Sequence, residues 1–271
     1  MLEATGLLEG SGLQGMQAGT LVLIVLAGFA AGWVDAVVGG GGLLQLPALL
    51  LVPGMSPVQA LATNKMGSIF GTTTSAITYY RRAHPDLKTA IPMATVALAG
   101  SFGGAILATL LPAEVIKPVI IAALIAVGLF TVFKPTAGEL TQLRYTGRQH
   151  YAVALAIGFV IGGYDGLIGP GTGSFLIIAM VALLGYNFLA ASAKAKIVNM
   201  ATNLGALAFF LPSGHLLWGI GLVLGVANMC GGYLGARMAV SKGSRFIRIV
   251  FLTVVGALIL KLGYDVLFPA A

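Results

Sequence analysis

The chain has 271 residues, of which 58% are hydrophobic and only 8% are charged. Soluble domains carry roughly a quarter charged residues, whereas each helical crossing of a bilayer takes about 20 apolar residues. The net charge is +7, but the basic residues lie in short connections between apolar runs and form no patch interleaved with aromatic residues. The composition therefore excludes a soluble domain and a nucleic-acid partner, and it predicts an all-α integral membrane protein in a lipid bilayer.

The first 19 residues contain Glu3 and Glu9 but no Lys or Arg. A secretory signal begins with positive charge, so we expect residues 1–19 to be an acidic tail on the outer face of the membrane. The single cysteine, Cys230, lies within an apolar run, which excludes an internal disulfide framework.

Ten apolar stretches follow in chain order, and one sizeable polar connection, 134–150, divides them into two groups of five. We expect a first repeat over 20–133, a cytoplasmic linker over 134–150 and a second repeat over 151–268. The stretches are 20–38, 43–52, 58–80, 89–111, 116–133, 151–168, 173–186, 189–211, 216–240 and 246–268.

The two halves resemble each other in sequence. Asp35 corresponds to Asp165 at a shift of 130 residues, and Lys65 corresponds to Lys196 at a shift of 131, with several glycines in the same frame. The connection 81–88 is basic, but its counterpart 212–219 has no Lys or Arg. Because positive connections face the cytoplasm, the sequence predicts inverted repeats with an odd number of crossings each, in a bacterial inner membrane with both termini outside.

Each half begins with a hydrophobic segment that is interrupted by glycine. The run Gly39–Gly42 and its counterpart 169–173, which includes Pro170, disfavour a continuous helix. The next segment, 43–52, is about 15 Å long as a helix, which is too short to span a bilayer. We therefore expect two bent hairpins, whose new helix starts at Leu43 and Ser174 would favour an anion through their free N–H groups.

A polar stripe follows each hairpin, consisting of one cation and two neutral hydrogen-bonding groups on one helical face. These are the candidate substrate-binding residues, together with Asn64 beside the first stripe and the donors Gln45, Thr172 and Ser174 near the breaks. The first stripe is Lys65, Ser68 and Thr72, and the second is Lys196, Asn199 and Asn203. An unpaired lysine at this depth costs about 3 kcal/mol. The alternative is that both lysines extend to the headgroup region, which is also our interpretation of Lys194.

Asp35 and Asp165 precede the glycine breaks by four residues. They are candidates for binding a proton or sodium ion that drives transport, for pairing with the lysines, or for capping the bend. The three histidines lack metal-ligand spacing, and no nucleophile–base pair indicates an enzyme. We expect neither a metal nor another cofactor.

The segments 32–42, 62–65 and 100–104 resemble the sulfite exporter TauE/SafE family of membrane permeases, as do Pro92 and the second-half segments 158–173 and 196–203. The resemblance implies a permease for sulfite, sulfoacetate or other organic anions that works without ATP. It supports Asn64, Lys65, Lys196, Asn199 and Asn203 as site residues. Pro170 and Thr172 depart from an all-glycine second loop, so the two halves of the site are not expected to be strictly equivalent.

The combined prediction is a secondary transporter that moves a small anion by alternating access, through a site between the repeats. Two alternatives remain from the sequence. One is a sodium- or proton-coupled carrier of a neutral or cationic solute centred on Asp35 and Asp165. The other is an intramembrane enzyme or an assembly subunit that transports nothing.

Overall fold

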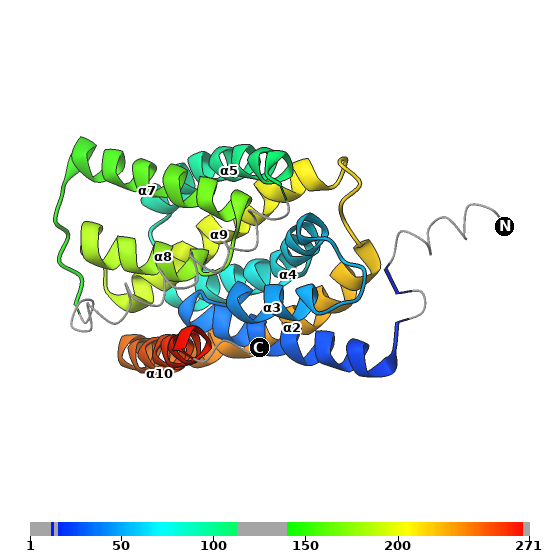
Figure 1. The fold of residues 1–271 in the computed structure, drawn as a ribbon. Helices are drawn as coiled ribbons and strands as arrows, with labels where there is room; N and C mark the ends of the chain where they lie inside the picture. The colour runs from blue at the N-terminus through cyan, green and yellow to red at the C-terminus, as the bar shows by residue number, and fades with distance from the viewer. Residues whose placement is uncertain (1–11, 14–15, 113–139, 268–271) are drawn as a thin grey trace.

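The computed structural model describes residues 12–13, 16–112 and 140–267. Within these residues all the secondary-structure elements are helices. The predicted segment 116–133, residues 134–139 of the linker and most of the acidic tail lie outside these residues. In chain order the helices are α2 (Ala18–Val38), α3 (Gly42–Leu50), α4 (Pro57–Ala83), α5 (Leu87–Leu110), α7 (Gly147–Leu167), α8 (Thr172–Ala179) with its π-helical extension η1 (Met180–Leu184), α9 (Phe188–Phe210) and α10 (Trp218–Leu267) (Figure 1).

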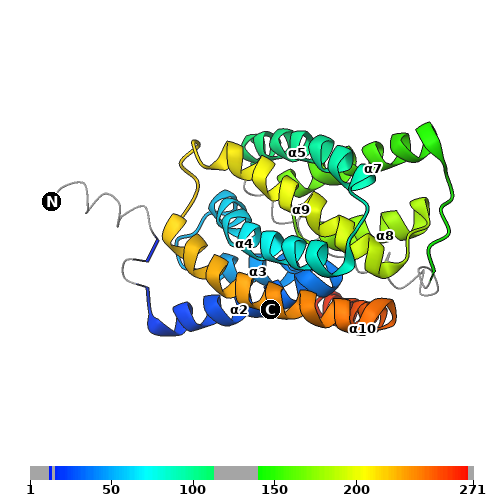
Figure 2. The same cartoon turned by 180° about the vertical axis from the view of Figure 1, so that it is seen from behind.

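Four of the described helices are long and apolar enough to cross a bilayer, namely α2, α5, α7 and the Trp218–Val250 part of α10. The two helices that carry the polar stripes, α4 and α9, lie between them and contact each other. Helices α2 and α10 pack together on one side of this central pair, and α5 and α7 pack together on the other (Figures 1 and 2). The polar faces of α4 and α9 are thereby covered by apolar helices.

The helix boundaries follow from local capping chemistry. Ser56 and Gln59 form a capping box at the start of α4, in which each side chain accepts a hydrogen bond from the backbone N–H of the other. Asp86 and Asn187 accept backbone N–H groups in the same way at the starts of α5 and α9. The caps of α4 and α9 fix where the two stripe-bearing helices begin and hence the depth of each stripe.

Both predicted glycine breaks are confirmed. Helix α2 ends at Val38 and α3 begins at Gly42, while α7 ends at Leu167 and α8 begins at Thr172. Gly39 ends α2 in the left-handed region with φ 82°, where a side chain would be strained. The two predicted segments 216–240 and 246–268 correspond to the two parts of α10, because Gly243, with φ 71° and ψ −168°, breaks the helix between them.

The two outer helices on each side approach each other closely where glycines remove the side chain. A Cβ atom on Gly32 of α2 would overlap the backbone of Asn228 in α10, and one on Gly162 of α7 would overlap the backbone of Ala97 in α5. Close approach through small residues is the main way in which helices pack in lipid, where no hydrophobic force drives them together.

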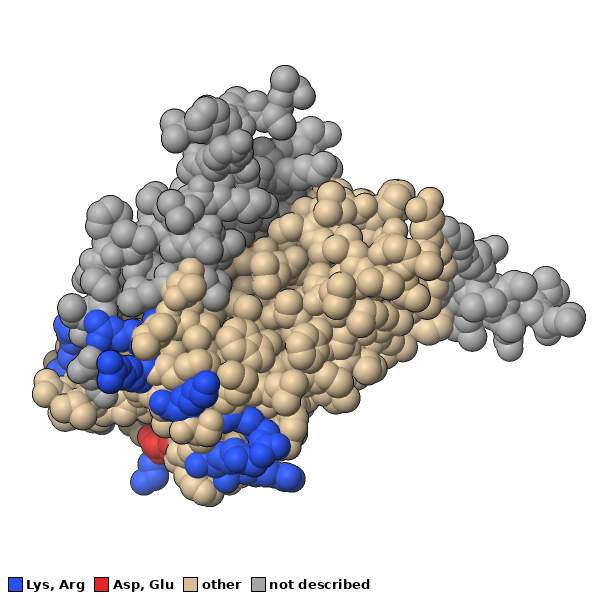
Figure 3. Space-filling model, turned by 90° about the horizontal axis from the view of Figure 1, so that it is seen from below, with Lys and Arg blue, Asp and Glu red and all other residues tan. Residues whose placement is uncertain are grey.

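The connection between α4 and α5 lies at the opposite end of the molecule from the connection between α9 and α10 (Figures 1 and 2). Lys and Arg side chains gather at one end of the visible face, and the rest of the described surface in that view shows neither (Figure 3). The ends of the helix bundle therefore differ strongly in charge.

Candidate functional site

Two ion pairs join the halves of the chain in the centre of the bundle. The ammonium of Lys65 on α4 lies 2.7 Å from the carboxylate of Asp165 on α7. The ammonium of Lys196 on α9 lies 2.8 Å from the carboxylate of Asp35 on α2. Both lysines are fully enclosed, with 1% and 0% of their surface exposed. Neither extends to the headgroup region, so the alternative interpretation of these two residues is wrong.

Pairing of the lysines with the aspartates was one of three roles that the sequence left open for Asp35 and Asp165. The cost of burying an ion is several kcal/mol, and an opposite charge at hydrogen-bonding distance offsets much of it. Each stripe cation is therefore held by a carboxylate from the other half of the chain, and the four charged groups together carry no net charge.

A small polar cavity of about 20 Å³ lies beside these pairs. The predicted residues that line it are Asp35, Asn64, Lys65, Ser68, Asp165, Thr172, Asn199 and Asn203, and glycines of both breaks complete the wall. The Oδ1 atom of Asn64 is buried and has no hydrogen-bond partner. The volume suits about one water molecule, so the site is closed in this conformation.

The tips of the two hairpins contact each other at this cavity. The backbone N–H of Ser174 donates to the carbonyl of Gly39 at 3.1 Å, and its hydroxyl donates to the carbonyl of Val38 at 2.8 Å. The Thr172 hydroxyl donates to the carbonyl of Gly169 at 2.7 Å, which organises the start of α8. Because Gly39 and Gly173 meet backbone to backbone, a side chain on either would separate the tips.

Four of the predicted residues lie outside the cavity wall. Lys196 does not line the cavity but donates to Asp35, which does. Ser174 hydrogen-bonds the tip of the other hairpin. Thr72 accepts a hydrogen bond from Asn203 at 3.3 Å. Gln45 donates to the Asn64 carbonyl at 3.2 Å. These side chains position the cavity wall rather than form it.

Sequence reasoning missed Asn228 on α10, which is buried and donates to the Gln45 side-chain oxygen at 2.6 Å. This bond links α10 to the short helix α3 and, through Gln45, to α4. The available signal was an isolated amide within the apolar run 216–240, a position where a polar side chain requires a partner.

A second polar cluster lies at the basic end, away from the cavity. Lys194 is buried, donates to the backbone carbonyl of Asp86 at 2.6 Å and lies over the ring of Tyr186. Thr89, His150 and Tyr186 form a triangle of contacts between 3.1 and 3.2 Å. The ammonium of Lys194 thus contacts the connection between α4 and α5, but the side chain is 1% exposed, so the predicted extension into the headgroup region is not observed.

Two groups in the connections of this cluster have shifted pKa values. Burial of the Asp86 carboxyl group acts to raise its pKa, but the hydrogen bond from the Lys88 backbone and the charge of Lys194 outweigh it and hold the pKa below its ordinary value. Burial raises the pKa of the Tyr186 phenol, against the opposing effect of its hydrogen bond with Thr89. No cluster of three or more His, Cys, Asp or Glu side chains that could hold a metal ion occurs in the described residues.

The match to known sequences covers nearly the whole chain, since residues 24–262 match the family described as sulfite exporter TauE/SafE. The chain belongs to the TauE/SafE family. Three relatives of this TauE/SafE protein are named probable membrane transporter proteins: ORF9 of a Sinorhizobium species (38% identity, covering 92% of this chain and 94% of the relative), YfcA of Escherichia coli (35%, 90% and 90%) and a protein of Haemophilus influenzae (34%, 90% and 95%). No solved structure matches it.

The TauE/SafE protein is therefore a membrane transporter with a small substrate and a lipid environment, and it is not an enzyme. The intramembrane enzyme or assembly subunit that the sequence left open is thereby excluded. The polar cavity between the hairpin tips is its candidate transport site.

Proposed function

We propose that the protein is a secondary transporter that moves a small anion, such as sulfite, sulfoacetate or another organosulfonate, across a bacterial inner membrane by alternating access. The observation that carries the proposal is the pair of Lys–Asp contacts that cross between the two halves around one polar cavity. Buried ionisable groups of this kind are costly in a membrane and typically mark a substrate or ion pathway.

The proposal includes two inverted repeats, over 20–133 and 151–268. Lys65 of the first half contacts Asp165 of the second half. The corresponding lysine of the second half, Lys196, contacts the corresponding aspartate of the first half, Asp35. A third correspondence supports the same relation. Lys194 contacts the Asp86 backbone, while its counterpart Thr63 accepts a hydrogen bond from the backbone N–H of Leu217, the counterpart of Asp86 at the shift of 131.

In this proposal the substrate binds between the hairpin tips. Lys65 supplies the positive charge at the cavity wall, and Asn64, Ser68, Asn199 and Asn203 hydrogen-bond the substrate oxygens, with Thr172 at the start of α8. Lys196 acts through Asp35 and does not contact the substrate. Because about 20 Å³ holds no more than about one water molecule, a hairpin must move away from the other half before the anion can enter.

Charge balance indicates how anion binding would be coupled. The enclosed site contains two cations and two carboxylates, so an arriving anion adds uncompensated negative charge in a medium of low dielectric constant. Protonation of Asp165 would restore neutrality and release the Lys65 ammonium toward the anion. We therefore propose that the anion and a proton move in the same direction.

The test uses purified protein in liposomes that contain a pH-sensitive dye. Labelled sulfite or sulfoacetate should enter, the lumen should acidify, and both signals should be lost in Lys65→Ala. Anion uptake without proton movement would refute the coupling, whereas no uptake of any tested anion would refute the anion assignment. Ser213→Cys, in the connection between α9 and α10, lies outside the cavity, leaves the site intact and serves as the control.

One observation favours the alternative of a proton- or sodium-coupled carrier of a neutral or cationic solute. Both Asp35 and Asp165 line the cavity, whereas only one of the two stripe lysines does. For such a carrier, Asp165→Asn would abolish uptake of the neutral or cationic solute, and labelled sulfite would not cross at all. The same liposomes therefore distinguish the two functions.

The repeat orientation has its own test. With Cys230 replaced by serine, single cysteines are placed in the connection after α4 by His84→Cys and in the connection after α9 by Ser213→Cys. Inverted repeats require that a membrane-impermeant maleimide labels the two from opposite sides. Labelling of both from the same side would contradict the inverted arrangement.

A further inference from the structure

A groove between α4 and α10 lies at the basic end of the bundle, away from the transport cavity. It has a volume of about 270 Å³ and is lined by Thr74, Ile77, Thr78, Arg81, Arg82 and Tyr233. The five residues from α4 recur at helical spacing on one side of that helix, and Tyr233 closes the groove from α10. Nothing in the transport proposal uses this groove.

The groove is basic and its charges are uncompensated. Arg81 and Arg82 are exposed, and neither has a carboxylate partner among the described residues. Arg237 adds a third guanidinium, because it donates to the Tyr233 hydroxyl at 3.2 Å and lies 5.4 Å from the centre of that ring. Planar guanidinium groups in this number match the oxygens of a phosphate diester.

The surroundings of the groove are apolar, which distinguishes it from a site open to water. Ile77 is 46% exposed and Tyr233 is 42% exposed. One face of α10 then continues through Met229, Val226 and Leu222, each more than one third exposed and spaced at whole helical turns. Along α10 this face therefore changes from basic to aromatic to apolar residues. The same order is typical of a protein surface that passes from the lipid headgroups into the hydrocarbon.

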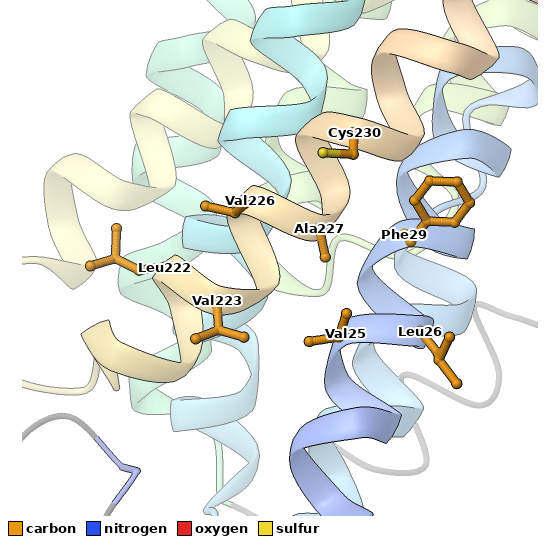
Figure 4. Close-up of a pocket in the computed structure, with 8 residues that line it drawn as sticks. All are labelled: Val25, Leu26, Phe29, Leu222, Val223, Val226, Ala227 and Cys230. Carbon is orange, nitrogen blue, oxygen red and sulfur yellow. The ribbon is translucent and has the colours of Figure 1, made fainter.

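The apolar end of this face borders a second hollow. A groove of about 650 Å³ between α2 and α10 is lined only by apolar side chains and Cys230, with Val25, Leu26 and Phe29 coming from α2 and Val223 and Ala227 among those from α10 (Figure 4). Val226, which lines this groove, is seven residues from Tyr233, or about 10 Å along the helix. That distance lies within the roughly 15 Å depth of hydrocarbon in one leaflet.

We infer that this surface binds one anionic phospholipid, with its phosphate among Arg81, Arg82 and Arg237 and an acyl chain along α10 toward the apolar groove. Basic pockets between membrane helices recognise anionic headgroups through such charges. The lipid belongs to the leaflet that the basic end faces. The inference concerns lipid binding alone and does not rest on the proposed transport function.

The test measures lipid bound to the delipidated protein by native mass spectrometry in detergent. The parent should bind one long-chain phosphatidylglycerol and no phosphatidylcholine. The triple variant R81Q/R82Q/R237Q should bind phosphatidylglycerol on the order of 100-fold more weakly, since each cation contributes about fivefold near an anionic headgroup. Lys88→Gln removes one charge at the same end but outside the groove, and it should stay within about twofold of the parent.

The outcomes separate the possible sources of the phosphate. Inorganic phosphate and dihexanoyl phosphatidylglycerol carry the charge without a long chain, and neither should displace the long-chain lipid at equal concentration. Displacement by either, unchanged binding in the triple variant, or an equal loss in Lys88→Gln would overturn the inference. Because all four side chains are exposed, unfolding curves of the lipid-free variants should match the parent, and transport activity does not enter the readout.

Discussion

The ion pair between Lys196 and Asp35 offers a quantitative test of what holds the centre of the bundle together. The two charged atoms are 2.8 Å apart, and the side chains are 0% and 12% exposed. At an effective dielectric constant of about 20, their attraction is about 6 kcal/mol, which is comparable to the several kcal/mol lost when each ion leaves water. The intact pair is therefore close to neutral for stability, while either partner alone is costly.

The perturbation is a double-mutant cycle with Lys196→Met and Asp35→Asn. Each single variant leaves one group without its partner, so we expect each to lose about 3–5 kcal/mol of unfolding free energy. The double variant removes both charges and should lose less than either single variant, which gives a coupling energy of about 3 kcal/mol or more.

The assay is equilibrium unfolding in detergent, followed by tryptophan fluorescence. Lys194→Met is the control, because that ammonium contacts a backbone carbonyl and the Asp86 carboxylate, which is 53% exposed. Combined with Asp35→Asn, it should show effects that simply add. If the Lys196 and Asp35 effects also add, the pair does not hold these residues and the description of a charge-compensated site is refuted.

Three further predictions concern helix packing and the basic end. Gly32→Ala places a methyl group into the backbone of α10, so it should prevent folding or lower the unfolding free energy by more than about 3 kcal/mol. Gly103→Ala meets open space and should leave the unfolding free energy unchanged or raise it by up to about 1 kcal/mol. The melting temperature in detergent measures both effects. Asp86→Ala removes a helix cap and a charge beside Lys194, so it should lower the unfolding free energy by about 1–2 kcal/mol. Asp86→Asn keeps the cap and should lose about half as much. Equal losses in the two variants would contradict a capping role. The lowered pKa of Asp86 means that its ionised form contributes stability above about pH 4 and that this contribution is lost as the pH falls through its folded pKa. Unfolding curves of the parent and Asp86→Asn should therefore differ by a constant amount at neutral pH and converge below about pH 4.

Much of the arrangement could be predicted from local chemistry. The glycine runs predict both helix breaks because glycine and proline destabilise a helix wherever they stand. The spacing of Lys65 and Ser68 in the first stripe, and of Asn199 and Asn203 in the second, predicts that each pair faces one direction, since helical periodicity depends on sequence alone. All four side chains line the cavity.

The sequence could not decide which charges meet. Periodicity gives the face that a lysine occupies but not its distance from an aspartate more than 90 residues away, so pairing, proton binding and capping remained equally open for Asp165. The sequence also could not show that Lys196 pairs with Asp35 without lining the cavity, or that Asn228 donates to Gln45. Both contacts depend on how helices from opposite halves cross.

The sequence by itself determined that this chain is a membrane protein with polar groups in two matching places, because hydropathy and helical spacing are local properties. The tertiary structure decided that these groups neutralise each other across the two halves around a closed cavity. The physical reason is that charge compensation acts over a few ångströms in space, and only helix packing establishes which residues lie within that distance.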